Sequence, residues 1–437
     1  MTQALFQVWI FSFLLYRVNI VGSLSVDNLM VPFLVLLWLF TGARANGQVN
    51  RARFRMVLLA TLVFLSLIVA DIAKLGGGGS AGALLPPIME HLKHYAYVLL
   101  PLLYISSEQS LKWTLTSLLA VAVINSALAM IGALGLASPF VLVGESTRIP
   151  GLMRARGPLV NDGDMALLIS LLAVLVWTVA RHRLDFAGPK WVRLLGIVAM
   201  LSGIIAIQSR NLILTVAMAF GLYYWLRMVM QGGRGGARVL LSVVGIFLFF
   251  GAVTFVAVYA DEIIAWVTHM FGVSGEGTVR DRLSSYSSAM MLLEGKVLFG
   301  LTATQIAANS LFVAKLHNMW LGLALFSGIF GVVAVFALIA ASFVGALRLS
   351  RSPDWKEYGV VLASFILASL WFSPNFYPGH NAFIFWFCIG LAMTSGQTLY
   401  FSRQHSLQVR PAGDVSEPSS QVPGRARILR YKATRAS

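Results

Sequence analysis

The chain has 437 residues, of which 58% are hydrophobic and only 11% are charged, and its formal net charge is +16. This composition excludes an ordinary soluble globular domain and predicts an integral membrane protein with room for many spans of about 20 residues. The single cysteine, Cys388, excludes a disulfide framework or a cysteine-based metal site within one chain.

Hydrophobic segments recur along residues 1–400 and predict an all-α fold, a polytopic bundle of about twelve transmembrane helices. The first segment has a weakly charged start and no small-residue cleavage site, so we interpret it as a retained helix rather than a signal peptide. The polar residues 401–437 predict a basic, disordered tail. The predicted spans are 4–22, 28–43, 56–73, 92–106, 113–135, 162–180, 194–208, 211–227, 239–259, 319–346, 357–372 and 381–400.

Basic residues gather in alternate connections, for example at Arg53, Arg183 and Arg351, and in the tail. The positive-inside rule places these connections and both termini in the cytoplasm. Topology and attraction to lipid headgroups therefore explain most of the charge, and no nucleic-acid partner is expected. The connections predicted to face outward are 71–91, 136–161, 209–211, 260–318 and 373–380.

Six arginines fall on this outer face against the positive-inside bias. Arginine presents a planar fork that binds phosphate through two hydrogen bonds. As a set they predict an anionic ligand such as a lipid pyrophosphate, although ordinary loop charge or salt bridges to nearby carboxylates can explain any single one. The six are Arg148, Arg154, Arg156, Arg210, Arg280 and Arg282.

Arg210 is the most informative of these arginines, because only a tight turn separates the hydrophobic segments on either side of it. A charge so close to the hydrocarbon is costly and usually paired. Its place at a helix start also favours an anion there. The alternative is that Arg210 extends toward the headgroups of the outer leaflet.

The connection 260–318 is long enough to contain structure of its own, including a short amphipathic segment at 263–271. A capping-box pattern at 278–281 is followed by apolar residues at helical spacing. We expect the apolar stripe of this helix to pack on the membrane domain. Arg282 would then point toward the boundary between the helix and the membrane domain, and Arg280 toward the surface of the loop. The stripe comprises Val279, Leu283, Tyr286, Met290 and Leu293.

His317 is the strongest candidate for a general base. With Asn318 it stands at the head of a hydrophobic helix, where unsatisfied polar groups would cost several kcal/mol. A second pair, His380-Asn381, also precedes an outer helix; it can line the same cavity, but we favour a structural role for His380. We expect His91 and His94 to lie in a loop, in solvated or headgroup-facing roles.

No metal site or cofactor is predicted. Asp162 and Asp164 can hold a cation in principle, but they begin a hydrophobic helix, and we favour Asp162 as its N-cap. The glycine-rich residues 76–80 lack the lysine and the preceding strand of a phosphate-binding loop.

The pattern His317-Asn318, nine residues, Gly328, two residues, Gly331 closely resembles the signature of bacterial O-antigen ligases. Their wider relatives are the O-antigen polymerases and the pilin-glycosylating oligosaccharyltransferases. The resemblance runs in order from about Arg154 to Asn381 and includes RGPLVNDGDMALLIS, Ser209-Arg210 and the loop arginines. It implies a membrane-embedded glycosyltransferase of GT-C-like architecture with one large periplasmic loop, in the bacterial inner membrane.

That family transfers an undecaprenyl-pyrophosphate-linked O-antigen polysaccharide to a sugar hydroxyl of lipid A-core, with inversion and without a metal. The resemblance implies that His317 is the catalytic histidine and that Arg210 and either Arg280 or Arg282 hold the pyrophosphate. Asn318 would orient His317 or bind sugar hydroxyls. The implied partners are the lipid-linked glycan, lipid A-core oligosaccharide and membrane lipids.

Two other readings remain open. An O-antigen polymerase would use the same chemistry with a growing glycan as acceptor, but one dominant outer loop and the motif spacing favour the ligase. A polytopic transporter of lipid-linked glycans would fit twelve spans and would use Arg17 as a pathway residue. Against a transporter, the sequence shows no internal repeat, and its polar residues concentrate on one face.

Overall fold

The computed structural model describes most of the first 400 residues, which form one compact unit, while residues 401–437 form a second unit that lies outside the described part. The predicted span 239–259, Arg17 and the tail therefore fall largely or wholly outside it. The described residues are 2–15, 19–21, 24–45, 51–73, 81–136, 143–149, 152–155, 162–182, 190–207, 210–231, 276–301, 319–351, 355–371 and 384–394, with single residues at 245, 305 and 308.

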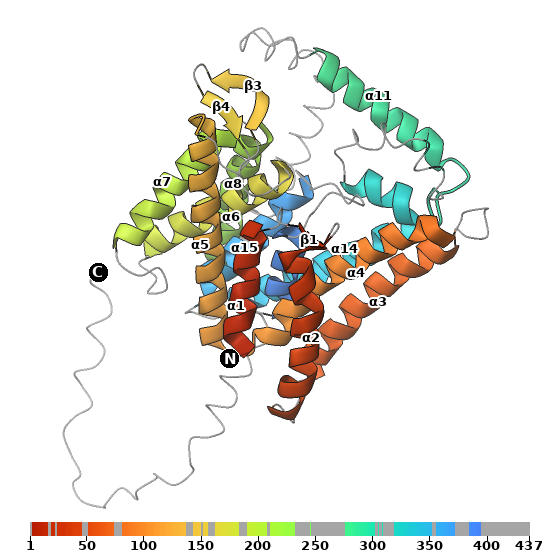
Figure 1. Ribbon diagram of the computed structural model, residues 1–437, viewed down its shortest axis with the longest axis horizontal. Helices are drawn as coiled ribbons and strands as arrows, with labels where there is room; N and C mark the ends of the chain where they lie inside the picture. The colour runs from red at the N-terminus through yellow and green to blue at the C-terminus, as the bar shows by residue number, and fades with distance from the viewer. Residues whose placement is uncertain are drawn as a thin grey trace, which may run out of the picture. The chain divides into compact units, whose positions relative to one another are not determined.

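The described chain is mostly helical, as predicted (Figure 1). Most predicted spans coincide with a helix to within a few residues at each end. The helices are α1 (Thr2–Ser12) with the short η1 (Phe13–Leu15), α2 (Val26–Ala45), α3 (Arg51–Ala73), α4 (Ala81–Tyr104), α5 (Glu108–Ala133), α6 (Asp162–His182), α7 (Lys190–Ile207), α8 (Arg210–Gln231), α11 (Glu276–Leu293), α14 (Met319–Leu349), α15 (Lys356–Trp371) and an unlabelled helix, Ile384–Thr394.

Two small antiparallel hairpins, which the sequence did not predict, interrupt the helices. β1 (Asn19–Val21) pairs with β2 (Leu24–Ser25), so the first predicted span ends early, and β3 (Val143–Ile149) pairs with β4 (Leu152–Ala155). In both places a β-branched residue, Val21 or Ile149, precedes a short sequence typical of turns, Gly-Ser or Pro-Gly, and a leucine follows it. Short strands of this kind are easily missed beside strong helical signals.

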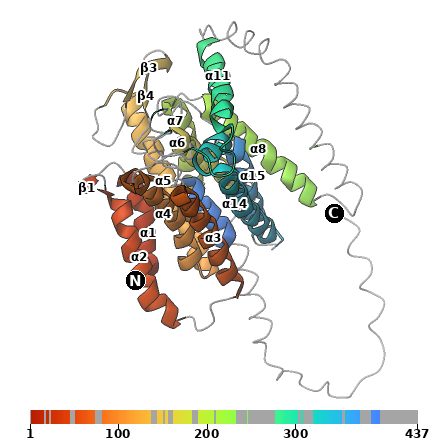
Figure 2. The ribbon, with the colours of Figure 1, turned by 90° about the vertical axis from the view of Figure 1, so that its right-hand side faces the viewer.

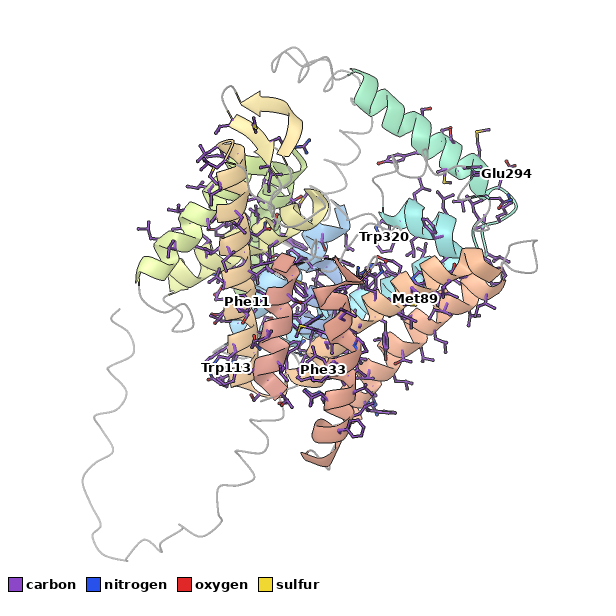
Figure 3. All side chains as sticks on the ribbon, viewed as in Figure 1. Phe11, Phe33, Met89, Trp113, Glu294 and Trp320 are labelled. Carbon is purple, nitrogen blue, oxygen red and sulfur yellow. The ribbon has the colours of Figure 1, made fainter. Side chains whose placement is uncertain are left out.

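Three of the described helices are long and apolar enough to cross a membrane: Arg53–Ala73, Glu108–Ala133 and Trp320–Leu349. Large apolar side chains on the helix surfaces, including Phe33 and Trp113, are exposed to the surroundings rather than packed in the core (Figure 3). An apolar outer surface suits lipid and not water. The structure is thus that of a helical membrane protein.

The helices pack around one extended core. α3 packs between α4 and α14, α14 packs on α15, α15 on α8, α8 on α6, and α7 on both α6 and α5. Near the N-terminus, aromatic rings fill the core: Trp9 stacks on Tyr97 with ring centroids 5.4 Å apart, and Phe6 on Tyr104 at 5.0 Å.

Side-chain contacts show which helix ends lie together. Arg53 at the start of α3 donates to the carbonyl of Ile105 after α4. Lys112 at the start of α5 lies 5.9 Å from the ring of Trp355, just before α15. Glu357 in α15 pairs with Arg227 near the end of α8 at 3.3 Å.

These contacts place the start of α3, the end of α4, and the starts of α5 and α15 at one end of the bundle. The opposite helix ends carry the connections that follow α3, α5, α7 and α15 and the one that precedes α14. We call this the loop end. It coincides with the set of connections that the charge pattern predicts to face outward, and β3–β4 and α11 both lie at one end of the helices in the two views (Figures 1 and 2).

Candidate functional site

The His-Asn pair stands directly before α14. His317 and Asn318 lie outside the described residues, and the helix begins at the next residue, Met319. His380, Asn381 and Arg156 also lie outside the described residues. What the structure describes is therefore the frame that positions the predicted catalytic histidine, rather than its side chain.

That frame contains a break in α14 at Gly328. The glycine has φ 63° and ψ −167°, a conformation that interrupts the helix and that residues with a side chain rarely adopt. A Cβ atom at this position would lie 2.0 Å from the carbonyl oxygen of Leu298. Only glycine fits here, for both conformational and steric reasons.

The second glycine of the motif, Gly331, allows close contact between two helices. A Cβ atom there would lie 2.3 Å from the side chain of Ser327 and 3.0 Å from that of Leu67 in α3. Both motif glycines are therefore explained by packing, and they mark the point where α14 breaks and meets α3.

Residues 297–301, which we call the clasp, run alongside the break and replace the hydrogen bonds that the helix loses there. The amide of Leu301 donates to the carbonyl of Leu325 at 2.7 Å, and the amide of Ile329 donates to the carbonyl of Val297 at 2.8 Å. Gly300, with φ 77°, lets the clasp approach closely, because a Cβ there would lie 2.4 Å from the Leu325 oxygen. Unpaired backbone groups would be costly in a packed interior.

The break divides α14 into a head, residues 319–327, and a long part, residues 329–349. The long part alone measures about 31 Å at 1.5 Å per residue, enough to cross the hydrocarbon. The head is therefore not needed for spanning. The head begins at Met319, at the loop end of the bundle.

The head packs against α11 and the clasp in a small hydrophobic cluster separate from the main core. Its buried members are Ala289, Leu293, Leu301, Leu325 and Phe326. The helix that carries Arg280 and Arg282 is thus attached to the element that follows His317. The side chains of both arginines lie outside the described part.

The predicted stripe on α11 is only partly correct. Tyr286 and Leu293 contact the cluster as expected, but Met290 is 62% exposed and Ala289 is buried in its place. The prediction chose Met290 because methionine is more hydrophobic than alanine. In the structure, Ala289 lies on the face of α11 that contacts the cluster. Val279 and Leu283 lie in the helix, and their side chains are not described.

One of the predicted arginines, Arg154, contacts the end of α7. Arg154 on β4 donates from Nε to the carbonyl of Ile207, the last residue of α7, at 3.1 Å. α8 then begins at Arg210, as the sequence predicts. Arg154 therefore contacts a residue that precedes Arg210 by only a few positions, although Arg154 itself is distant from Arg210 in the sequence.

The hydrogen bond to Ile207 also gives Arg154 a structural role that the sequence does not reveal. Carbonyl groups at the end of a helix are unpaired and carry partial negative charge, so a guanidinium there is stabilising. Arg148 lies on the paired strand β3, and its side chain is not described.

A cluster of ionisable residues that the sequence did not predict lies between α3 and α4. His91 Nε2 lies 3.0 Å from Asp71 Oδ2, and His94 Nε2 lies 3.3 Å from Glu90 Oε1. Asp71 and His94 are each only 2% exposed, and the His94 ring lies 5.5 Å from that of Trp386.

The prediction that His91 and His94 lie in a solvated loop is therefore wrong. α4 begins at Ala81, more than two turns earlier than expected, and carries both histidines inside the bundle. The polar residues 90–94 indicate a loop if each of them must be hydrated. In the structure the carboxylates pair with the imidazoles, so these side chains can be buried without water. The four-residue spacing of Glu90 and His94 is the signal that could have revealed a helix.

α6 begins at Asp162, in agreement with a polar helix start, and the side chains of Asp162 and Asp164 are not described. Across the described side chains, no group of three histidine, cysteine or acidic residues lies close enough to hold a metal ion. Comparison of this chain with protein-family models and with curated proteins finds no match, so any functional assignment rests on the motif and on the geometry above.

Proposed function

We propose that this chain is an O-antigen ligase. It would transfer an undecaprenyl-pyrophosphate-linked polysaccharide to a sugar hydroxyl of lipid A-core at the periplasmic face of the inner membrane, with about twelve spans in a GT-C-like architecture and both termini in the cytoplasm. One observation carries the proposal: Gly328 and Gly331, the two glycines of the motif, both occupy positions where a side chain has no room. The packing around the break in α14 therefore accounts for both glycines, which supports the proposal.

In the proposed reaction, the acceptor hydroxyl attacks the anomeric carbon of the donor from the face opposite the pyrophosphate. The new glycosidic bond forms as the bond to the pyrophosphate oxygen breaks, and the configuration inverts. His317 accepts the hydroxyl proton, and Asn318 orients His317 or the sugar. Undecaprenyl pyrophosphate leaves with both electrons of the broken bond.

The arginines act on the leaving group. Negative charge builds up on the pyrophosphate in the transition state, and a fixed guanidinium that binds it there contributes a few kcal/mol per group. Arg210 at the α7–α8 turn and Arg282 or Arg280 on α11 are the proposed donors. Arg148, Arg154 and Arg156 extend the basic surface, and His380 is a secondary candidate for positioning the acceptor.

Two links support convergence of these groups. Arg154 ties the β3–β4 hairpin to the residues just before Arg210. α11 packs on the head of α14, which follows His317 directly. Both the α7–α8 turn and the head of α14 lie at the loop end of the bundle.

The test is transfer by purified enzyme from undecaprenyl-pyrophosphate glycan to lipid A-core. His317→Ala should lower the rate by about 10²- to 10⁴-fold while donor binding persists. Arg210→Lys and Arg282→Lys should fail nearly as badly as the alanine variants, because lysine keeps the charge but loses the fork. His405→Ala and Arg403→Ala, in the tail, are the matched controls and should be silent.

Near-normal turnover by His317→Ala would move catalysis to another residue. Wild-type rates in both lysine variants would exclude bidentate binding. Chelation of divalent ions should leave the rate unchanged; loss of activity that Mg²⁺ restores would instead implicate Asp162 and Asp164. Elongation of the glycan without lipid A-core would identify a polymerase.

A transporter of lipid-linked glycans is the second candidate. The acid–imidazole pairs of Asp71 with His91 and of Glu90 with His94 favour it, because buried ionisable pairs within a helix bundle often mark ion or proton pathways. A broken helix such as α14 is also common in transporters. Movement of the donor across vesicles without any glycan transfer would support this candidate and contradict the ligase.

A further inference from the structure

An exposed apolar surface lies where α11 ends and the clasp begins. Met290 is 62% exposed and Met291 is 71% exposed, and in the clasp Val297, Leu298 and Phe299 are each about half exposed. We call this surface the α11 patch. It consists of Met290, Met291, Val297, Leu298 and Phe299.

The patch is continuous with the outer surface of the membrane-spanning part of α14. The ring of Phe299 stacks on that of Phe330, with centroids 5.7 Å apart. Phe330 is itself exposed, and the exposed Val333 and Phe336 follow along the same helix. A surface that faces lipid along α14 therefore extends without interruption onto the clasp.

Four backbone amides of this segment are paired within the protein, which lowers the cost of placing an irregular segment in hydrocarbon. The amides of Glu294, Lys296, Gly300 and Leu301 donate to the carbonyls of Met291, Leu293, Lys296 and Leu325, respectively.

The side chains of α11 also change from polar to apolar from its first residue to its last. The helix begins with Glu276 and includes Arg280, Asp281 and Arg282, and it ends in the apolar residues 289–293. Exposed Glu294 and Lys296 follow α11 and lie between the two groups of patch residues along the chain; Figure 3 labels Glu294. This order suits a helix that passes from a polar region into an apolar one, with the long Lys296 side chain able to reach the headgroups.

We propose that the α11 patch is immersed among the acyl chains of the surrounding lipid. The end of α11 and the clasp then form a membrane anchor, which fixes how deep the head of α14 lies. This inference does not depend on the ligase reaction, because it rests on the exposure of the patch, the stacking of Phe299 on Phe330 and the polarity of α11.

The test is spin-label accessibility of the full chain in lipid nanodiscs. In a Cys388→Ala background, single cysteines replace Met291 and Leu298. Leu62, exposed in the middle of α3, provides the lipid-facing reference, and Ser287, exposed in the middle of α11, provides the water-facing one. At Met291 and Leu298, relaxation by oxygen should exceed relaxation by a water-soluble nickel chelate severalfold, as at Leu62, with the reverse at Ser287.

Nickel accessibility at Met291 and Leu298 equal to that at Ser287 would overturn the proposal. So would spin–spin broadening that disappears on dilution with unlabelled protein, because a second copy would then cover the patch. Oxygen accessibility that appears only after a polyprenyl phosphate is added would assign the patch to substrate instead. If labelling at Met291 or Leu298 lowers the melting temperature of the protein, a cysteine at Val297 is labelled in place of that position.

Discussion

At the scale of single residues, the motif glycines carry the sharpest structural requirement. Gly328→Ala places a Cβ against the carbonyl of Leu298 and forces a left-handed backbone onto alanine. The two effects together should destabilise the protein by about 2 kcal/mol or more. Thermal unfolding in detergent measures the change, and transfer activity should fall with it because the head of α14 shifts.

Gly221→Ala in α8 is the matched control, because nothing lies within 4 Å of a Cβ at that position. Alanine there should be neutral or stabilising by up to about 1 kcal/mol. If Gly328→Ala unfolds at the wild-type temperature while Gly221→Ala behaves as expected, α14 does not break at Gly328.

The pair of Asp71 and His91 should be energetically coupled. Changing either residue alone to alanine leaves a buried polar partner, at a cost of about 1–3 kcal/mol. The double variant should cost less than the sum of the single variants by more than 0.5 kcal/mol, as expected for contacting groups. Unfolding free energies of the four proteins give this coupling.

The exposed pair of Glu108 and Lys112 provides the comparison, with 3.0 Å between its charged atoms. Its coupling should be only about 0.3–0.5 kcal/mol, because water screens both groups. Equal coupling in the two pairs would show that burial of Asp71 adds nothing to the interaction.

At the scale of elements, hydrophobic segments predicted the helices well because a span must be long and apolar whatever surrounds it. α14 and α15 begin at or within one residue of the predicted spans. The early start of α4, the two hairpins and the clasp could not be predicted, because each depends on a partner distant in sequence. Asp71 makes the polar run of α4 tolerable, and Leu325 and Ile329 give the clasp its hydrogen bonds.

The candidate site follows the same division. The sequence indicated His317, the arginines and the motif glycines from residue type and spacing. It did not indicate that Gly328 breaks a helix, because a glycine inside an apolar run predicts only a weaker helix. The attachment of Arg154 to the end of α7 was equally hidden, since the bond is made to a backbone carbonyl.

Arg154→Ala should loosen the β3–β4 hairpin from α7. Loss of one hydrogen bond to a charged donor should cost about 1–2 kcal/mol in the absence of any ligand. Limited proteolysis of the protein should then cut more readily near residues 143–155, and the melting temperature should fall. A variant with unchanged proteolysis and melting but weaker donor binding would show that Arg154 serves the ligand and not the hairpin.

At the scale of the whole molecule, the helix contacts sort the connections into two sets, and the charge pattern predicts which set faces outward. A cysteine at Ser287, in a background with Cys388 replaced by alanine, should react with a membrane-impermeant reagent in intact spheroplasts. Cysteines at Lys112 and Arg351 should react only after the membrane is permeabilised. The opposite result would invert the topology and remove the basis for a periplasmic site.

The break in α14 also has a consequence for the order of events during synthesis. The clasp leaves the ribosome before the residues whose amide and carbonyl groups it pairs with. α14 is one continuous apolar stretch, so it can enter the membrane as an unbroken helix. The left-handed turn at Gly328 would then form only when the clasp returns to the nascent helix, which makes the placement of His317 one of the last steps in the maturation of the protein.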